Sequence, residues 1–271
     1  MKSTPSARAD AFHALHTDGL LLLANAWDAG SARLAQAAGA RAVATSSACV
    51  AWAHGWPDGN ALPVELVLRT IAAVAEAVDV PVTADIEAGY SDDPARVGEL
   101  AGRVIDAGAV GINIEDGSSD PALLCAKIAA ARKAADARGV NLFINARTDV
   151  WLRGLAPAGR RAEEAIARGA RYAEAGANGL FVPGITEAGE IEAVVRGVSL
   201  PVNVLARPGL SEAVDLRALG VRRYSAGSAI GEAANGLALA MMREFHASGR
   251  LDSQGVKAMA YPELNAAMRR D

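Results

Sequence analysis

Acidic side chains stand at the ends of consecutive apolar segments of this sequence. Asp85 and Glu87 lie at the end of segment 81–86, in ADIEAGY, and Glu115 ends segment 110–115, in INIEDG. Because side chains two residues apart point to the same side of a strand, we expect Asp85 and Glu87 to face one site. Carboxylates that gather without a cation raise one another's pKa values. A site with oxygen ligands and no His or Cys favours Mg²⁺, or Mn²⁺, so these residues predict a metal site.

A basic side chain stands at the end of the next apolar segment. Arg147 ends segment 141–147 and is followed two residues later by Asp149, in NARTD. A guanidinium group binds carboxylates through paired hydrogen bonds, and it also stabilises negative charge that develops on an enolate oxygen. Carboxylates, a divalent cation and an arginine together predict chemistry on a small carboxylic acid.

The elements that must position these side chains alternate along the chain. Short segments rich in Val, Leu and Ile are followed by Ala-rich segments with helical spacing, many of which end in Gly. This alternation predicts an α/β fold, a TIM (β/α)8 barrel whose active site lies at the carboxyl ends of its strands. A doubly wound open sheet is the alternative, but its Gly-rich phosphate loop is missing, because NAWDAGSA follows the first strand. The predicted strands are 20–25, 41–46, 81–86, 110–115, 141–147, 179–183, 201–206 and 221–226.

The rest of the chain suggests no second domain. We expect residues 1–271 to form a single barrel domain with a C-terminal helical extension over about 228–271. The predicted helix at 228–247 carries Leu, Ala, Met and Phe over much of its surface. We interpret it as the eighth helix, with an extension that packs on a partner subunit.

Composition limits the classes of function. The chain has a net charge of −4 and no concentration of Lys and Arg, so nucleic-acid binding is not expected. No apolar run reaches the roughly 18 residues of a membrane span, and the N-terminus lacks the apolar core of a secretion signal. The only cysteines, Cys49 and Cys125, have no paired spacing. We therefore expect a cytoplasmic protein with reduced thiols.

Several short motifs, taken in order, resemble those of the isocitrate lyase/phosphoenolpyruvate mutase superfamily. The resemblance covers about residues 20–230 and implies a TIM barrel whose eighth helix is swapped onto a neighbouring subunit, in a homodimer or homotetramer. It also implies a bound Mg²⁺ that holds the carboxylate and 2-oxo oxygens of the substrate. The motifs are NAWDAGSA, the segment around Ser46, WPD at 56–58, ADIEAGY at 84–90, INIEDG at 112–117 and ARTD at 146–149.

The resemblance implies a role for each residue at the predicted metal site. Asp85 matches the principal metal-binding aspartate of the family, and Glu115 matches the glutamate of the metal shell. Glu87 stands where the family usually has Asp. Asp58 matches an aspartate that reaches the metal shell in some members and acts directly in the phosphonate enzymes.

The resemblance also implies how the substrate is bound. Ser46, together with the backbone N–H groups of Ser47 and Ala48, matches the loop that grips the substrate carboxylate. Ser47 replaces the Gly that usually follows this serine. Arg147 matches the arginine that stabilises the enolate.

The segment after the fourth strand departs from the family pattern. Isocitrate-type lyases carry there a lid with a Lys-Lys/Arg-Cys-Gly-His motif, whose Cys acts as acid and base, and phosphoenolpyruvate mutases have a longer gating loop. This chain has EDGSSDPALLCAKIAAAR, and Cys125 lies inside a predicted helix, where we interpret it as a packing side chain. A short lid excludes water less well, which favours decarboxylation or retro-aldol cleavage over phosphoryl rearrangement.

These observations lead to one function and two alternatives. We predict a Mg²⁺-dependent lyase or decarboxylase that acts on a small 2-oxo or 2-hydroxy di- or tricarboxylic acid through an enolate, with Arg147 and Asp58 as catalytic residues. The first alternative is a mutase or hydrolase of phosphonopyruvate, in which Asp58 attacks or orients the substrate. The second is a protein that binds 2-oxoglutarate, oxaloacetate or pyruvate with weak or no lyase activity, because the lid Cys is missing.

Two further predictions concern residues outside the site. Glu163 and Glu164 lie opposite Arg168 at helical spacing, which predicts an exposed helix face. His13 and His16 lie on a predicted N-terminal helix and are interpreted as surface or packing residues.

Overall fold

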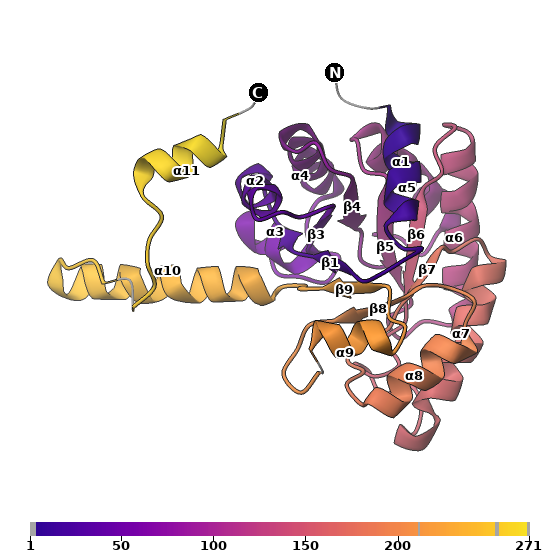
Figure 1. The fold of residues 1–271 in the computed structure, drawn as a ribbon. Helices are drawn as coiled ribbons and strands as arrows, with labels where there is room; N and C mark the ends of the chain where they lie inside the picture. Colours follow the sequence, from indigo (N-terminus) through magenta and orange to yellow (C-terminus); the bar gives the residue numbers. More distant parts are fainter. Residues whose placement is uncertain (1–3, 211, 253–254, 270–271) are drawn as a thin grey trace.

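The strands of this protein form one parallel sheet that curves into a barrel. The computed structural model describes residues 4–210, 212–252 and 255–269, and within them the strand order is β1-β9-β8-β7-β6-β5-β4-β3-β2. Every predicted strand segment contains an observed strand, so the TIM barrel is confirmed (Figure 1). The strands are β1 (Leu21–Leu23), β2 (Asn25–Ala26), β3 (Val43–Thr45), β4 (Val82–Asp85), β5 (Gly111–Glu115), β6 (Phe143–Arg147), β7 (Gly179–Phe181), β8 (Val202–Leu205) and β9 (Arg223–Ser225).

The first predicted strand is divided in two because the chain changes its partner at Ala24. β1 pairs with the last strand, β9, and β2 pairs with β3. This change brings the two edges of the sheet together through one continuous segment. The carboxyl ends of all the strands therefore surround one end of the barrel, where a TIM barrel has its active site.

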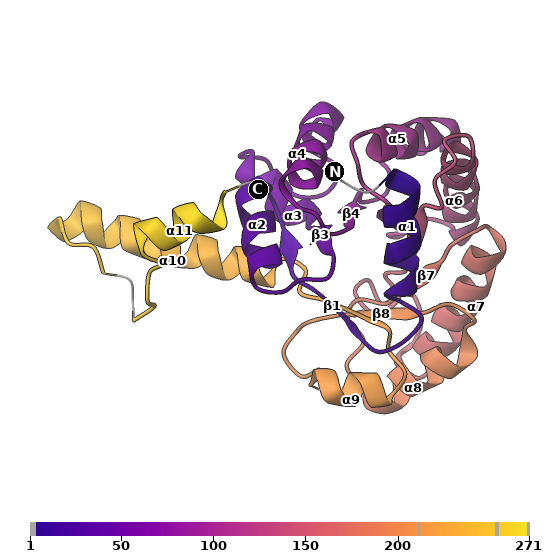
Figure 2. The same cartoon turned by 45° about the horizontal axis from the view of Figure 1, so that its top comes forward.

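Helices surround the barrel and begin where the sequence provides caps (Figure 2). Asp93 and Asp120 each accept a hydrogen bond from the backbone N–H two residues further on, at 2.9 and 2.8 Å. Pro94 and Pro121 follow as the first helical residues, where the N–H that proline lacks is not needed. The helices around the barrel are α2 (Ala29–Ala37), α3 (Ser47–Ala53), α4 (Val64–Ala77), α5 (Pro94–Asp106), α6 (Pro121–Asp136), η1 (Ala158–Arg160), α7 (Arg161–Glu174), α8 (Ala188–Gly197) and α9 (Ala213–Ala218).

The N-terminal helix, α1 (Pro5–Ala14), covers the amino-terminal end of the barrel. Phe12 is fully buried, and its ring centroid lies 5.4 Å from that of Phe143, the first residue of β6. His16 stacks on the same Phe143 ring at 4.0 Å. Gly111, the first residue of β5, permits this packing, because a Cβ atom there would come within 2.8 Å of Phe12. This end of the barrel is therefore filled with aromatic side chains.

The C-terminal segment leaves the barrel. α10 (Ala229–Ser248) projects away from the other helices (Figure 1), and Gly231 is its one buried residue. α11 (Tyr261–Ala267) turns back toward α2, where the Arg33 side chain donates a hydrogen bond to the carbonyl of Ala267 at 3.0 Å. Among the described residues, no helix has both the length and the apolar character needed to cross a membrane.

We expect His16 to make the stability of the protein depend on pH. Burial, helped by the charge of Arg223, lowers the pKa of His16 to about 3. The unfolded chain, whose histidine pKa is about 6.5, therefore takes up a proton before the folded protein does as the pH falls. The contribution of His16 to stability is present above pH 6.5 and is lost progressively between about pH 6.5 and 3.

Chemical denaturation of the wild type and of a His16→Phe variant across this range measures the effect. The variant keeps an aromatic ring but has no proton to bind, so the stability of the wild type should fall more steeply with decreasing pH. Above pH 7, the free energies of unfolding of the wild type and of the variant should change with pH at the same rate. Equal slopes throughout the range would show that His16 is not the group responsible.

Candidate functional site

A small pocket opens at the carboxyl ends of the strands. Its volume is about 120 Å³, and strands on all sides of the barrel contribute to its lining. The pocket brings together side chains that are far apart in the sequence. The predicted site residues that line it are Ser46, Ser47, Ala48, Asp58, Asp85 and Arg147.

Asp85 is the last residue of β4, and its partly buried carboxylate lines the pocket. It accepts hydrogen bonds from the backbone N–H of Glu87 at 3.1 Å and from the Ser47 hydroxyl at 3.4 Å. Burial raises the pKa of Asp85, and the positive charge of Arg147 opposes that shift. No salt bridge of the described residues includes Asp85. A partly buried carboxylate whose hydrogen-bond donors are neutral is stabilised by a cation, so Asp85 is the strongest candidate for a metal ligand.

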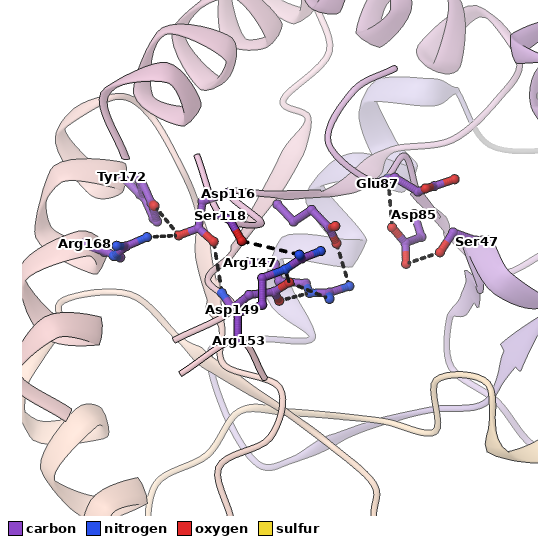
Figure 3. A network of polar contacts seen from close by, with 11 residues as sticks. Ser47, Asp85, Glu87, Asp116, Ser118, Arg147, Asp149, Arg153, Arg168 and Tyr172 are labelled. Atoms are coloured by element: carbon purple, nitrogen blue, oxygen red, sulfur yellow. Dashed lines mark hydrogen bonds and ion pairs between the residues drawn. The ribbon is translucent and has the colours of Figure 1, made fainter. Parts of the chain in front are cut away.

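Glu87 has a different orientation from the one that strand alternation predicts. β4 ends at Asp85, and Glu87 has a left-handed backbone with φ of 51°. Its carboxylate accepts hydrogen bonds from the Tyr90 hydroxyl at 2.8 Å and from the backbone N–H of Asn60. Figure 3 shows that the Glu87 carboxylate points away from that of Asp85. The expectation that the two side chains face one side is therefore wrong, because the strand ends before Glu87.

Glu115 and Arg147 form an ion pair beside the pocket. They end adjacent strands, β5 and β6, and are paired in register, with Glu115 Oε2 2.6 Å from an Nη atom of Arg147. Burial raises the pKa of Glu115 to about 7, although Arg147 opposes the shift. Arg147 also donates to both carboxylate oxygens of Asp149, at 2.7 and 3.1 Å. The guanidinium group is therefore held between two carboxylates at the pocket wall.

Asp149 is held in place by Asp116, which in turn contacts two side chains of α7. Its backbone N–H donates to Asp116 Oδ1 at 3.0 Å. The other oxygen of Asp116 accepts from Arg168 at 2.8 Å and from the Tyr172 hydroxyl at 2.7 Å, and the Asp116 side chain is 0% exposed. Figure 3 shows this series of contacts running from α7 to Arg147.

The prediction that Arg168 lies on an exposed helix face is wrong. Arg168 is buried, with one hydrogen bond outward to Glu164 at 2.7 Å and one inward to Asp116. The sequence does contain a signal for the burial of Arg168. The buried residues of α7 are Ala165, Arg168, Gly169 and Tyr172, whose spacing is that of the inner face of a helix.

Ser46 caps α3 next to the pocket. Its hydroxyl accepts a hydrogen bond from the backbone N–H of Cys49 at 3.4 Å, which starts the helix immediately after β3. The first N–H groups of a helix have no partner within it, so those of Ser47 and Ala48 are suited to binding a carboxylate. Asp58 follows in the loop between α3 and α4, is exposed, and lies close enough to raise the pKa of Asp85.

The loop over the pocket after β5 is short. Only residues 116–120 separate β5 from α6. Cys125 lies on α6, partly buried, and its thiol donates to the backbone carbonyl of Arg171 at 3.7 Å. Among the described residues, neither Cys nor His lines the pocket. The short lid and the packing role predicted for Cys125 agree with this geometry.

One wall of the pocket was not predicted from the sequence. It consists of Leu152, Phe181, Pro183 and Leu205, which come from the loop after β6 and from the ends of β7 and β8. Their order in the sequence carries no signal for a binding site, because apolar residues at strand ends are common in barrel cores. The shape of the barrel alone brings them together, and it places the Phe181 ring under the guanidinium group of Arg147, 5.9 Å from its Cζ atom.

The oxygen atoms of the site suit a hard cation. Mg²⁺ usually binds one or two carboxylates in a protein and completes its octahedral shell with water or substrate oxygens. Asp85 fits the direct ligand, and Glu115, Glu87 and Asp58 are carboxylates close enough for their charges to act on one another. Within the described ranges, no three His, Cys, Asp or Glu side chains surround a common metal position. The residues therefore fit a Mg²⁺ ion that is held mainly by Asp85 and by oxygens from outside the protein.

Comparison with known proteins agrees with this geometry. A sequence model described as phosphoenolpyruvate phosphomutase matches residues 12–246. An uncharacterized protein of Mycobacterium tuberculosis strain H37Rv is 40% identical over 223 residues, which cover 80% of this chain and 81% of that protein. An oxaloacetate decarboxylase of Paraburkholderia xenovorans is 30% identical over 79% of this chain and 73% of its own length.

Solved structures of similar proteins share the fold. A lyase/mutase-like protein of Burkholderia cenocepacia J2315 is 38% identical, with a TM-score of 0.88 over 97% of this chain and 95% of the other. A phosphonopyruvate hydrolase in complex with oxalate and Mg²⁺ is 25% identical, with a TM-score of 0.83 over 96% and 94% of the two chains. The chain therefore belongs to the phosphoenolpyruvate phosphomutase family, within the isocitrate lyase/phosphoenolpyruvate mutase superfamily of lyases and mutases that act on small acids.

Proposed function

We propose that this protein is a Mg²⁺-dependent lyase or decarboxylase that acts on a small 2-oxo or 2-hydroxy carboxylic acid through an enolate. The observation that carries the proposal is Asp85, a partly buried carboxylate that forms no ion pair with any described residue and shares one pocket with Arg147. The name of the Paraburkholderia relative, oxaloacetate decarboxylase, and the oxalate and Mg²⁺ bound to the phosphonopyruvate hydrolase support the same chemistry.

Each side chain of the site would have a separate role in the reaction. Asp85 would hold the metal ion, which when bound would polarise the 2-oxo group of the substrate. The N–H groups of Ser47 and Ala48, with the Ser46 hydroxyl, would hold the substrate carboxylate. Arg147 would stabilise the negative charge that develops on the enolate oxygen, because its guanidinium is already fixed at the pocket wall. Asp58, at the exposed side of the pocket, would exchange protons with solvent.

The position of Asp58 favours phosphonate hydrolysis as a second candidate function. The side chain lines the pocket together with Asp85 and Arg147, where it could attack or orient a phosphonate. The short loop at 116–120 disfavours this reaction, since it leaves the pocket more open to water. Release of phosphate from phosphonopyruvate that is abolished in Asp58→Ala would establish the second candidate.

We also propose that the protein is a homo-oligomer in which α10 packs on a second copy of the chain. Ile230, Leu239, Met242 and Phe245 of this helix are 45 to 60% exposed, although the helix is 20 residues long and largely apolar. A large apolar surface of this kind marks a contact with another protein.

We expect turnover to require a divalent cation and Asp85. With Mg²⁺ or Mn²⁺, a panel of 2-oxo and 2-hydroxy acids should include one that releases pyruvate, glyoxylate or CO₂, and EDTA should abolish the reaction. Asp85→Asn should lower kcat/KM by about 10²-fold or more, because it weakens the charge that holds the metal. Tight binding of 2-oxo acids without turnover would instead indicate a binding protein, and no binding would exclude the proposal.

We expect Asp116 to position Arg147 without touching the substrate. Asp116→Asn removes the charge that pairs with buried Arg168, so it should lower the free energy of unfolding by about 3 kcal/mol. It should also lower kcat by about tenfold with little change in KM, because Arg147 acts only on the transition state.

Asp120→Asn is the matched control for Asp116→Asn. Asp120 lies in the same loop with its side chain 76% exposed, and Asn caps a helix as well as Asp does. Steady-state kinetics and urea unfolding should both leave this variant close to wild type. Loss of stability in Asp116→Asn with an unchanged kcat would show that the contacts are structural only.

We expect charges on α10 to break the oligomer. Met242→Asp with Phe245→Asp should convert the protein to a monomer in sedimentation velocity, because unpaired carboxylates cannot be buried in an apolar interface. Leu22→Asp is the control, since Leu22 is similarly exposed but lies on β1. An unchanged sedimentation coefficient in the double variant would contradict packing through this helix.

A further inference from the structure

A buried arginine crosses the interior of the barrel below the pocket. Arg223 is the first residue of β9 and is 1% exposed, whereas Ser225, at the end of the same strand, lines the pocket. Its Nη2 atom donates to Asn113 Oδ1 on β5 at 3.1 Å, although β8, β7 and β6 lie between the two strands in the sheet. In the part of the chain that the structure describes, Nε and Nη1 of Arg223 have no hydrogen-bond partner. Burying a charged group in this way is costly, so we expect Arg223 to have a role that compensates for the cost.

The contact with Arg223 fixes the orientation of the Asn113 side-chain amide. A guanidinium group only donates hydrogen bonds, so the Asn113 atom that faces it must be the amide oxygen. Asn145 Nδ2 donates to the same oxygen at 2.9 Å. Both neighbours therefore hold the oxygen end of the amide, and the NH₂ end points the other way.

The NH₂ group of Asn113 is open to the pocket. Asn113 lines the pocket, and no described residue accepts a hydrogen bond from its Nδ2 atom. The described buried atoms without a partner do not include this nitrogen, so it remains accessible from the pocket. Asn113 also pairs in register with Asp85, the candidate metal ligand on the neighbouring strand. A free hydrogen-bond donor therefore lies beside the predicted metal position.

The positive charge of Arg223 acts at the same place. Burial lowers the pKa of Arg223 to about 9, and the negative charge of Asp85 opposes that shift, so the two groups are close enough to interact. A neutral N–H donor with a cation behind it suits an oxygen atom that carries negative charge. The carboxylate oxygens of a 2-oxo acid, and its C2 oxygen in the enolate form, are atoms of this kind.

We propose that Asn113 is a substrate-binding residue whose NH₂ group donates to a carboxylate or C2 oxygen of the substrate. Arg223 is the positioning residue that holds this group toward the pocket. The inference rests on the proposed function, because it takes a 2-oxo or 2-hydroxy acid as the ligand. Neither residue is among the site residues that the sequence predicts.

Binding of oxalate in the presence of Mg²⁺, measured in a calorimeter, tests the role of Asn113. Oxalate has the two-oxygen head of a 2-oxo acid, and its binding does not depend on turnover. Asn113→Ala removes the donor and should weaken oxalate binding by about tenfold, the usual effect of losing a hydrogen bond to a charged group. Asn113→Asp keeps an acceptor for Arg223, so it should unfold at no lower temperature than the wild type. It has no N–H to donate, however, and should weaken oxalate binding at least as much.

Asn25→Ala is the matched control for Asn113→Ala. Asn25 also lines the pocket, but its amide already donates to the carbonyl of Thr45 at 2.9 Å and accepts from the N–H of Gly227 at 2.8 Å. The oxalate affinity of this variant should stay close to that of the wild type. If Asn25→Ala lost as much affinity as Asn113→Ala, the loss would reflect general damage to the pocket, and the proposal would be wrong.

A double-mutant cycle tests the role of Arg223. Arg223→Met removes the partner that fixes the Asn113 amide, so oxalate binding should weaken several-fold. The variant should fold, because an apolar side chain of similar size replaces an unpaired buried charge. In the Asn113→Ala background the same change should weaken oxalate binding much less, since the group that Arg223 positions is gone. Equal losses in both backgrounds would show that Arg223 acts through its charge alone and would overturn its positioning role.

The wild type separates failure of this inference from failure of the proposed function. Absence of Mg²⁺-dependent oxalate binding to the wild type would overturn both. Tight oxalate binding that is unchanged in Asn113→Ala and in Asn113→Asp would overturn the inference only.

Discussion

The site depends on one guanidinium group held between carboxylates. Arg147 leaves the end of β6 and meets Glu115 from the neighbouring strand on one side and Asp149 on the other. The negative charges of Asp85 and Asp149 raise the pKa of Glu115, and the positive charge of Arg147 opposes the upward shifts at both Glu115 and Asp85. The arginine therefore permits several negative charges to remain at one end of the barrel. Its own position is fixed because its partners are fixed.

The contacts that hold Arg147 in position extend beyond the pocket. Asp116 has no exposure to solvent, yet it joins the backbone of Asp149 to Arg168 and Tyr172 on α7. The contacts connect the outer layer of helices with the inner layer of strands. The position of a charged side chain is set by the contacts that support it as well as by its own bonds. The network thus makes the packing of α7 part of the architecture of the site.

The lining of the pocket mixes charged, polar and apolar side chains. Phe181 is paired in register with Arg147, and its ring lies 5.9 Å from the guanidinium carbon. The apolar side chains of the lining, such as Leu152 and Phe181, therefore adjoin the charged ones within one small pocket.

Local sequence patterns were enough to predict the barrel and most of the pocket. Alternating strand and helix segments define the (β/α)8 order, and the fold rule that active sites lie at the carboxyl ends of strands brings Ser46, Asp58, Asp85 and Arg147 together. These features are short-range or depend on chain order, so a single sequence displays them.

Other features depend on where the chain turns and on which helix face points inward. The strand ends at Asp85, so the alternation that would place Glu87 beside it no longer applies. Arg168 pairs with both Glu164, one turn away in the sequence, and Asp116, which is 52 residues away. The apolar residues of the pocket lining come from three separate barrel segments. Only tertiary structure decides such long-range neighbours, because nothing in the local sequence records which distant side chain will satisfy a buried charge.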